Sequence, residues 1–162
     1  MTKEFNSLDE IQKYYNEETN TYIFREDGVN IDLVIFNFNL DINANIIADT
    51  IRGWNINADD IDVYNIDCYD TVAKNIVACS INTHDIEADD IETCEDIKAW
   101  NIYAHNITAK NIMADNIYAH DISYWAICYA MQDIECHSIK GRRKNHKQFA
   151  LDGTLEVEEN EW

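Results

Sequence analysis

The middle of the chain repeats one pattern of apolar and polar positions every five residues. An isoleucine occupies one position of each unit from Ile46 to Ile91 and, after one added residue, from Ile97 to Ile127, with Thr71 as the exception. Two residues later comes a small residue, most often alanine, until Tyr124 and Tyr129 break the pattern. An α-helix repeats its apolar face about every 3.6 residues and a half-buried strand about every second residue. A period of five therefore predicts the stacked coils of a solenoid.

Each five-residue unit predicts one short extended side of a coil. The isoleucine and the small residue are two apart, so both point to the interior of an extended segment while the other three residues face water. Asn or Asp precedes nearly every isoleucine, and these side chains suit a corner because they bond nearby backbone and tolerate turn dihedrals. Neighbouring coils are expected to pair as strands about 4.8 Å apart.

The repeated units resemble those of the pentapeptide-repeat protein family. The resemblance is carried by phrases such as Asn101 to His105 and Asn106 to Lys110, and it covers Asn45 to Tyr129. It implies an all-β fold, a right-handed quadrilateral β-helix with about twenty residues in each coil. Family units place a small residue two positions before the central one, whereas this chain has large or charged residues there, such as Trp54 and Asp59. A three-sided coil of about fifteen residues is therefore the alternative.

The N-terminal residues 1–40 are predicted to cap the solenoid, because unpaired strand edges at its end would otherwise bind other chains. The capping-box sequence Ser7 to Glu10 predicts a helix that ends near Asn16. A β-hairpin is predicted from Thr21 to Phe38. One face of the helix would carry Leu8, Ile11 and Tyr15.

The solenoid itself is expected at residues 41–141 and a second cap at residues 142–162, all in a single domain. The second cap is predicted to be a β-hairpin that turns at Asp152 and Gly153. Before it lies a basic cluster from Lys140 to Lys147, interpreted as an internal partner for acids, with nucleic-acid binding as the alternative.

Negative charge is the second main feature of the sequence. The chain has a formal net charge of −19, and residues 31–139 hold nineteen Asp and Glu against Arg52, Lys74, Lys98 and Lys110. The charge therefore belongs to the repeat surface. It is densest in an acidic belt, which consists of Asp59, Asp60, Asp62, Asp67, Asp70, Asp85, Glu87, Asp89, Asp90, Glu92, Glu95 and Asp96.

The outward positions after the acidic belt are rich in aromatic residues. Exposed aromatic side chains are favoured at protein interfaces. These residues are therefore predicted to bind a partner or a second copy of the chain as a homodimer. This aromatic zone consists of Trp100, Tyr103, Tyr118, Tyr124 and Trp125.

The chain lacks the patterns expected of enzymes and metalloproteins. It has no Gly-rich phosphate loop and no recurring arrangement of nucleophile and base, so neither catalysis nor a bound cofactor is predicted. With coils of about twenty residues, His84 and His105 would share a column, but no third ligand follows them and no metal site is predicted. The five cysteines form no Cys-x-x-Cys pair, which favours buried thiols over a disulfide framework.

The acidic belt predicts a DNA mimic, an inhibitor that occupies the positively charged DNA channel of a bacterial enzyme. The resemblance implies the same function, because some pentapeptide-repeat proteins bind DNA gyrase as DNA-shaped inhibitors. The chain also resembles small acidic phage proteins that block CRISPR or restriction nucleases. The alternative is a scaffolding solenoid that joins protein partners, with the acids serving solubility.

The expected partner is thus a DNA-binding bacterial nuclease or topoisomerase, with no direct contact to nucleic acid or membrane. No apolar run approaches the roughly 20 residues that span a bilayer, and the N-terminus has no signal-peptide stretch. These features predict a cytoplasmic protein of the bacterial host cell.

Overall fold

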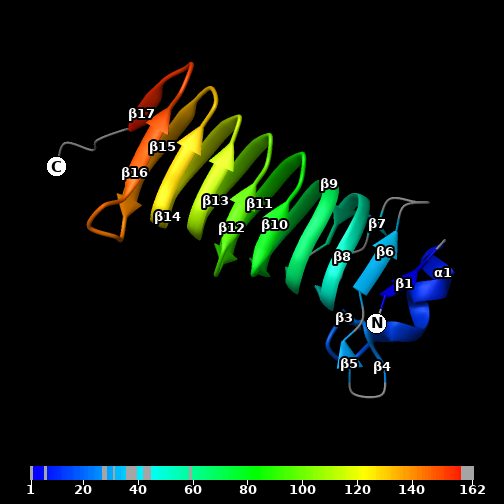
Figure 1. The fold of residues 1–162 in the computed structure, drawn as a ribbon. Coiled ribbons are helices and arrows are strands. Elements are labelled where there is room, and N and C mark those ends of the chain that lie inside the picture. The colour runs from blue at the N-terminus through cyan, green and yellow to red at the C-terminus, as the bar shows by residue number, and fades with distance from the viewer. Residues whose placement is uncertain are drawn as a thin grey trace.

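The strands of the protein form a parallel β-solenoid of about seven turns, which confirms the predicted all-β solenoid. The coils stack along one axis, from a cap that contains the short helix α1 to the C-terminal strands at the opposite end (Figure 1). The computed structural model describes residues 2–5, 7–26, 29–30, 32–35, 40–41, 45–58 and 60–157.

Short elements precede the regular coils. They are β1 (Thr2–Glu4), α1 (Leu8–Ile11), the 3₁₀ helix η1 (Gln12–Tyr14), β2 (Tyr15–Asn16), β3 (Thr21–Ile23), β4 (Arg25–Glu26), β5 (Val29–Asn30), β6 (Asp32–Ile35) and β7 (Leu40–Asp41). The coils comprise β8 (Asn45–Asn57), β9 (Asp60–Ala78), β10 (Ser80–Asn82), β11 (Asp85–Thr93), β12 (Asp96–Lys98), β13 (Asn101–Ala114), β14 (Asn116–Ala130), β15 (Ile134–Gly141), β16 (Lys147–Ala150) and β17 (Leu155–Val157).

The strand register shows that one coil contains fifteen residues. Ile51 of β8 lies beside Ile66 of β9, and Ile66 lies beside Ile81 of β10. A coil therefore has three five-residue sides, so the prediction of a quadrilateral coil is wrong and the three-sided alternative is confirmed. The three-sided and the four-sided coil both have sides of five residues, so the period of five does not show how many sides a coil has.

The three faces of the solenoid are named here by the columns of side chains that point inward. Face A has Ile46, Ile61, Ile76, Ile91, Ile107 and Ile122. Face B has Ile51, Ile66, Ile81, Ile97, Ile112 and Cys128. Face C has Ile56, Thr71, Ile86, Ile102, Ile117 and Ile134.

These inward columns form the core, as the periodicity predicts. The isoleucines are buried, as are most of the small residues two positions later, for example Ala48 and Ala114. Burial of one such isoleucine contributes roughly 1.5 to 3 kcal/mol. Thr71 occupies an isoleucine position on face C and is also buried.

An added residue in β14 changes which side chains point inward. Opposite β13, Cys128 pairs with Ile112 and is buried, whereas Ile127 pairs with Asn111 and is 39% exposed. The expected inward position of Ile127 is therefore wrong, because the register shifts after Ala109.

Tyr124 is part of the core, so its assignment to the outward aromatic zone is wrong. It stands at a small-residue position and is fully buried. Its neighbours in the adjacent coils are Ala109 and Gly141, which leave room for the ring. The phenol hydroxyl donates a hydrogen bond to Gln148 Oε1 over 2.8 Å.

The N-terminal cap agrees with the prediction in outline and differs in detail. The helix is only one turn of α1 followed by η1, and Ser7 makes no side-chain capping bond. Ile11 is buried and Tyr15 packs against the core, as predicted, but Leu8 is 43% exposed, so its place on the buried face is wrong; Tyr14 is buried in addition. The tightening into a 3₁₀ turn places Tyr14 inward, where its ring packs against Phe5 and Phe24. Only β4 and β5 of the predicted hairpin pair antiparallel with each other, and their turn lies outside the described residues, whereas β3 and β6 each pair in parallel with β8.

The C-terminal segment forms a further coil, so the prediction of a hairpin cap is wrong. Strand β16 pairs in parallel with β14, and β17 pairs in parallel with β15. At the expected hairpin turn, the backbone N–H groups of Leu151 and Asp152 donate to carbonyls of the preceding coil, those of Ala130 and Met131. The chain therefore continues the stack instead of folding back on itself.

The cysteines divide into two groups. Cys68, Cys128 and Cys136 are buried free thiols, as predicted, and burial raises the pKa of Cys68 and of Cys128 to about 12. Cys79 and Cys94 form a disulfide between successive coils, so the expectation of a free thiol is wrong for this pair. Their separation of fifteen residues equals one coil, which brings the two side chains together.

Candidate functional site

Five acids of the acidic belt accept a hydrogen bond from an asparagine of the next coil. Nδ2 of the asparagine donates to Oδ1 of the aspartate over 2.6 to 2.9 Å in the pairs Asn75–Asp60, Asn82–Asp67, Asn101–Asp85, Asn106–Asp90 and Asn111–Asp96. Hydrogen bonds to an ionised acceptor are shorter and stronger than neutral ones. These acids therefore hold successive coils together.

This structural role was missed from the sequence, although a signal for it was present. Each of these aspartates is followed by its asparagine fifteen or sixteen residues later. That spacing becomes meaningful once the coil is known to contain fifteen residues, because side chains one coil apart then lie side by side.

A sixth acid of the belt, Glu95, pairs with Lys110 of the next coil. The Lys110 ammonium donates to Glu95 Oε2, and this hydrogen bond raises the pKa of Lys110. Both side chains are about half exposed, so the pair contributes little to stability. It does offset one negative charge of the belt.

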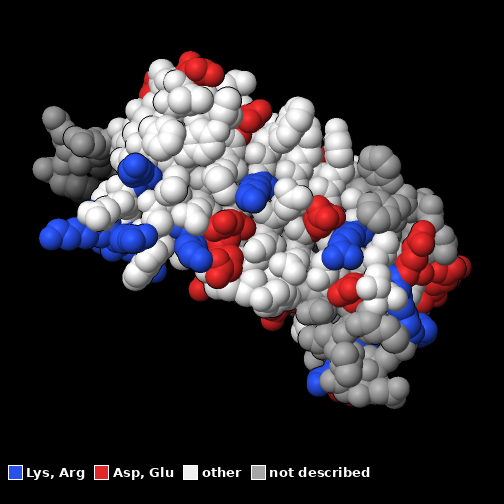
Figure 2. All heavy atoms as spheres, in the orientation of Figure 1, with Lys and Arg blue, Asp and Glu red and all other residues white. Residues whose placement is uncertain are grey.

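The acids that remain free of these inter-coil pairs include four that point outward into solvent. Asp62 and Glu92 are exposed on face A, while Glu87 and Asp89 are exposed on face C or at its following corner. The acidic belt therefore surrounds the early coils and forms no single stripe. Figure 2 shows one face of the molecule, on which the red side chains form separate patches. Asp59 lies outside the described residues.

The aromatic zone is likewise spread over several sides of the solenoid. Tyr103 and Tyr118 stack on face C with ring centroids 5.1 Å apart. Trp100 follows face B and is 59% exposed, whereas Trp125 follows face A and is 54% exposed. With Tyr124 in the core, the structure brings only Tyr103 and Tyr118 of the zone into direct contact.

The histidines stack in two columns that differ from the predicted one. His105 and His120 lie on successive coils with ring centroids 4.7 Å apart, and His137 stacks on His120 at 4.6 Å. His84 belongs to another column, between the rings of Tyr69 and Trp100. The predicted column of His84 and His105 is therefore wrong, because it assumed the longer coil.

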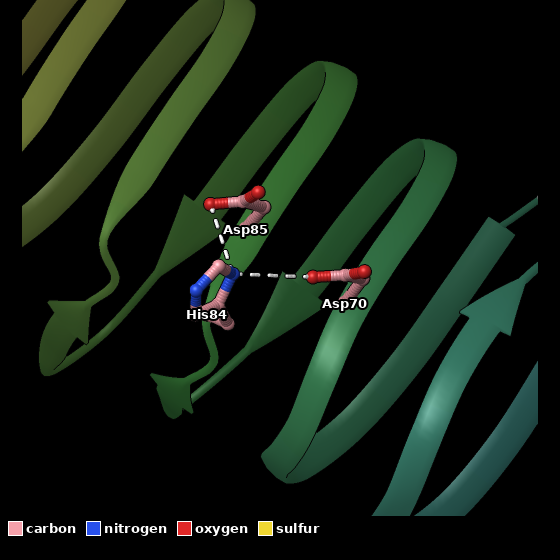
Figure 3. A group of neighbouring side chains, drawn as sticks. All are labelled: Asp70, His84 and Asp85. Atoms are coloured by element: carbon pink, nitrogen blue, oxygen red, sulfur yellow. Dashed lines mark ion pairs between the residues drawn. The ribbon is translucent and has the colours of Figure 1, made fainter.

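One group among the described residues brings three metal-ligating side chains together: Asp70, His84 and Asp85. Its ligand atoms lie within 4.8 Å of one another, and Figure 3 shows the imidazole beside the two carboxylates, with one ring nitrogen directed toward both. His84 Nδ1 is 3.6 Å from Asp70 Oδ1 and 3.3 Å from Asp85 Oδ1. Both aspartates belong to the acidic belt, and the five-residue pattern does not connect them with His84.

The basic cluster lies at the C-terminal end, where blue side chains gather in Figure 2. Arg142 Nε donates to Ser123 Oγ over 2.7 Å, and Arg143 and Lys144 are exposed. Within the described residues no ion pair joins the cluster to an acid.

Comparisons with protein-family models, with curated proteins and with solved structures find no match to this chain. In the part of the chain that the structure describes, no helix has the length and apolar character needed to cross a membrane.

Proposed function

We propose that the protein is a DNA mimic that binds the cationic DNA channel of a bacterial enzyme, a nuclease or a topoisomerase, and so inhibits it without catalysis of its own. The observation that carries the proposal is the charge of the early coils. Between residues 60 and 96, the acids of the belt are accompanied by Lys74 as the only basic residue. Such a surface attracts a cationic channel and repels nucleic acid.

The three-sided coil changes the charge density from what a larger coil would give. With about 4.8 Å per coil, residues 31–139 form a rod about 34 Å long with about one net negative charge per 2.3 Å. B-DNA carries about one charge per 1.7 Å. The acidic belt occupies only about 12 Å and exceeds that density, with about one net charge per 1.2 Å. The belt, and not the whole rod, is therefore the proposed mimic.

The side chains proposed to contact the target are Asp62, Glu87, Asp89 and Glu92. They are exposed, and within the described residues none of them accepts a hydrogen bond from an asparagine of the next coil, as Asp60 and Asp90 do. Asp85 and Asp90 are different, because each accepts a bond from an asparagine of the next coil. A lysine at either position would break that bond as well as reverse the charge.

The test is inhibition of a panel of purified bacterial DNA enzymes: a CRISPR effector nuclease, restriction nucleases and DNA gyrase. Inhibition of at least one enzyme is expected, and it should weaken steeply with ionic strength and with excess duplex DNA. A variant with lysine at all four contact positions should lose inhibition. The matched control places the same four lysines at the exposed acids Asp9, Glu17, Glu18 and Glu156, far from the belt, and should inhibit normally.

Two results would count against mimicry. One is a target whose binding is unaffected by excess duplex DNA. The other is full inhibition by the variant with four lysines in the belt, since the contact would then lie elsewhere.

A scaffolding role is the second candidate, and the exposed Trp100 and Trp125 favour it. Binding through these rings should tolerate high salt, because it depends on apolar contact. Homodimerisation through the Tyr103–Tyr118 stack would appear as a dimer mass in sedimentation, which Tyr103→Ala should abolish.

We further infer that the relation to pentapeptide-repeat proteins concerns the five-residue period, since the coil here has three sides where theirs has four. The proposed target places the protein in the cytoplasm of a bacterial cell. In that reducing compartment Cys79 and Cys94 would be thiols for most of the time.

A further inference from the structure

The corner that precedes face C contains an interrupted ladder of polar side chains. From the C-terminal side, Asn116 Nδ2 donates to Asn101 Oδ1, and Asn101 Nδ2 donates to Asp85 Oδ1, both over 2.8 Å. The next rung pairs Asp85 with Asp70, side by side in the register of β11 and β9. A carboxylate cannot donate a hydrogen bond. This rung therefore lacks the donor that asparagine supplies in the others.

His84 fills the space beside these two carboxylates. Its imidazole is held between Tyr69, at 4.6 Å and nearly parallel, and Trp100, at 4.4 Å. The backbone fixes the same arrangement, since the His84 N–H donates to the Tyr69 carbonyl and the Trp100 N–H donates to the His84 carbonyl, both over 2.6 Å. The ring is thus prepositioned with Nδ1 toward the carboxylates (Figure 3).

Two polar atoms of the cluster are buried without a hydrogen-bond partner: Asp70 Oδ1 and His84 Nδ1. Buried polar atoms without partners are costly and rare in folded proteins. Two adjacent carboxylates also repel each other unless a cation lies near them. Both facts favour a cation in contact with these atoms.

The geometry points to a divalent metal ion, and we propose that Asp70, His84 and Asp85 form a binding site for Zn²⁺ or a similar transition-metal ion. In a tetrahedral zinc site with bonds of about 2.0 to 2.2 Å, ligand atoms are about 3.3 to 3.6 Å apart. The two separations from His84 Nδ1 are 3.3 and 3.6 Å. The third separation, between the two carboxylate oxygens, is at most 4.8 Å, so a rotation that brings one carboxylate up to about 1.2 Å nearer to the other would complete the tetrahedral spacing.

The donor set favours this class of metal over Mg²⁺ or Ca²⁺. Those ions prefer oxygen ligands, whereas imidazole nitrogen suits zinc and its neighbours. The charge of two carboxylates balances that of one divalent ion. The fourth position of the tetrahedron would take water, as in zinc sites with three protein ligands.

Further contacts support the ligands from outside the site. Asn101 holds the Asp85 carboxylate, and Thr83 Oγ1 bonds the carbonyls of Tyr69 and Asp85 over 2.8 and 3.1 Å. Such contacts orient metal ligands before the ion arrives. The site joins two successive coils, so metal binding is expected to stabilise their pairing.

The test is a titration of the full chain, stripped of metal by a chelator, with Co²⁺ and then with competing Zn²⁺. We expect one ion per chain, a visible absorption band of tetrahedral Co²⁺ that Zn²⁺ removes, and a change in the fluorescence of Trp100, which stacks on His84. Zn²⁺ should also raise the melting temperature.

Two variants separate metal binding from folding. Asp85→Asn removes a charged ligand and supplies the amide donor that the ladder lacks, so it should bind Zn²⁺ about tenfold more weakly or worse yet melt, metal-free, no lower than the wild type. The matched control, Asp90→Asn, makes the same change in a ladder on face A and should bind Zn²⁺ like the wild type. His84→Gln should lose both the Co²⁺ band and the stabilisation.

Three outcomes would overturn the proposal. Absence of a Co²⁺ band in the wild type would show that the cluster binds no such ion. Unchanged Zn²⁺ affinity in Asp85→Asn would place the ion elsewhere. A thiolate charge-transfer band would assign it to a cysteine.

Discussion

Tyr124→Ala is expected to lower the free energy of unfolding by about 3 to 5 kcal/mol, the range for removing a large aromatic side chain from a core. The ring is fully buried between Ala109 and Gly141 of the adjacent coils. Neither neighbour has a side chain long enough to fill the space, so the cavity should persist. Tyr124→Phe keeps the ring but leaves Gln148 Oε1 without its donor, which should cost about 1 to 2 kcal/mol.

The measurement is unfolding in urea, followed by tryptophan fluorescence and by circular dichroism. The control is Tyr103→Ala, because this ring is 47% exposed and its main contact is the stack on Tyr118. That change should cost at most about 1.5 kcal/mol. Equal losses in Tyr124→Ala and Tyr103→Ala would show that Tyr124 lies on the surface, and the argument for its inward position would fail.

The same burial gives Tyr124 a distinct titration. Burial raises the pKa of its phenol to about 12, from an ordinary value near 10, because the charged phenolate is disfavoured inside the protein. The stability gained from the neutral phenol is therefore complete below about pH 10. It is lost as the pH rises toward about 12, the folded-state pKa. The near-ultraviolet absorbance of phenolate should show this late step in the wild type and not in Tyr124→Phe.

Three further predictions concern contacts between coils. The Ser138 hydroxyl donates a hydrogen bond to Asp121 and, with His120, lowers the pKa of that carboxyl. Ser138→Ala should raise this pKa in an NMR titration, and the stability that the ionised group loses as the pH falls from its unfolded-state pKa through its folded-state pKa should be smaller than in the wild type. Reduction of the Cys79–Cys94 disulfide, which closes a loop of one coil, should lower the free energy of unfolding by up to about 3 kcal/mol, and Cys94→Ser should make unfolding insensitive to reductant. Asp60→Asn together with Asp90→Asn should preserve both ladders and the melting temperature while weakening inhibition of the target, which an inhibition curve would show.

The sequence pattern was sufficient to predict the solenoid and most of its core. Ile46 and Ile102 point inward because every unit repeats the same sequence pattern, an isoleucine and a small residue two positions apart on an extended segment. Such local information does not determine how many sides close a coil. That number depends on the corner angles and on the fit of side chains from all sides in the interior.

Errors in the prediction arose where a coil departs from the repeat. Between Tyr124 and Cys128 one added residue moves Ile127 outward, and the five-residue spacing gave no warning because Ile127 still matched it. At the C-terminus, Asp152 and Gly153 have the composition of a hairpin turn, but the strand edge of the preceding coil offered backbone partners for this segment. A tertiary contact thus overrode a local turn signal.

The candidate sites depended on the coil length more than on the residue types. The residue types show that Asp70 and Asp85 are acids and that His84 is a possible ligand, but a coil of about twenty residues would place His84 beside His105 instead. Only a coil of fifteen residues brings Asp70 beside Asp85. The coil of fifteen residues also places Asp60 and other acids of the belt beside an asparagine of the next coil, where they accept a hydrogen bond.

These ladder bonds do not neutralise the acids that accept them, because asparagine carries no charge. Asp60 and Asp90 therefore contribute to the negative potential of the belt while they also hold coils together. The acids of the belt therefore differ in how well the fold tolerates their replacement. Replacing an outward acid breaks no hydrogen bond between coils, whereas replacing Asp60 or Asp90 can break one. Where Asp70 lies beside Asp85, the negative charge and the pairing of coils conflict. Two carboxylates are adjacent there, and neither supplies the amide donor that asparagine provides elsewhere. A bound cation is the addition that would satisfy the buried oxygen and relieve the repulsion together.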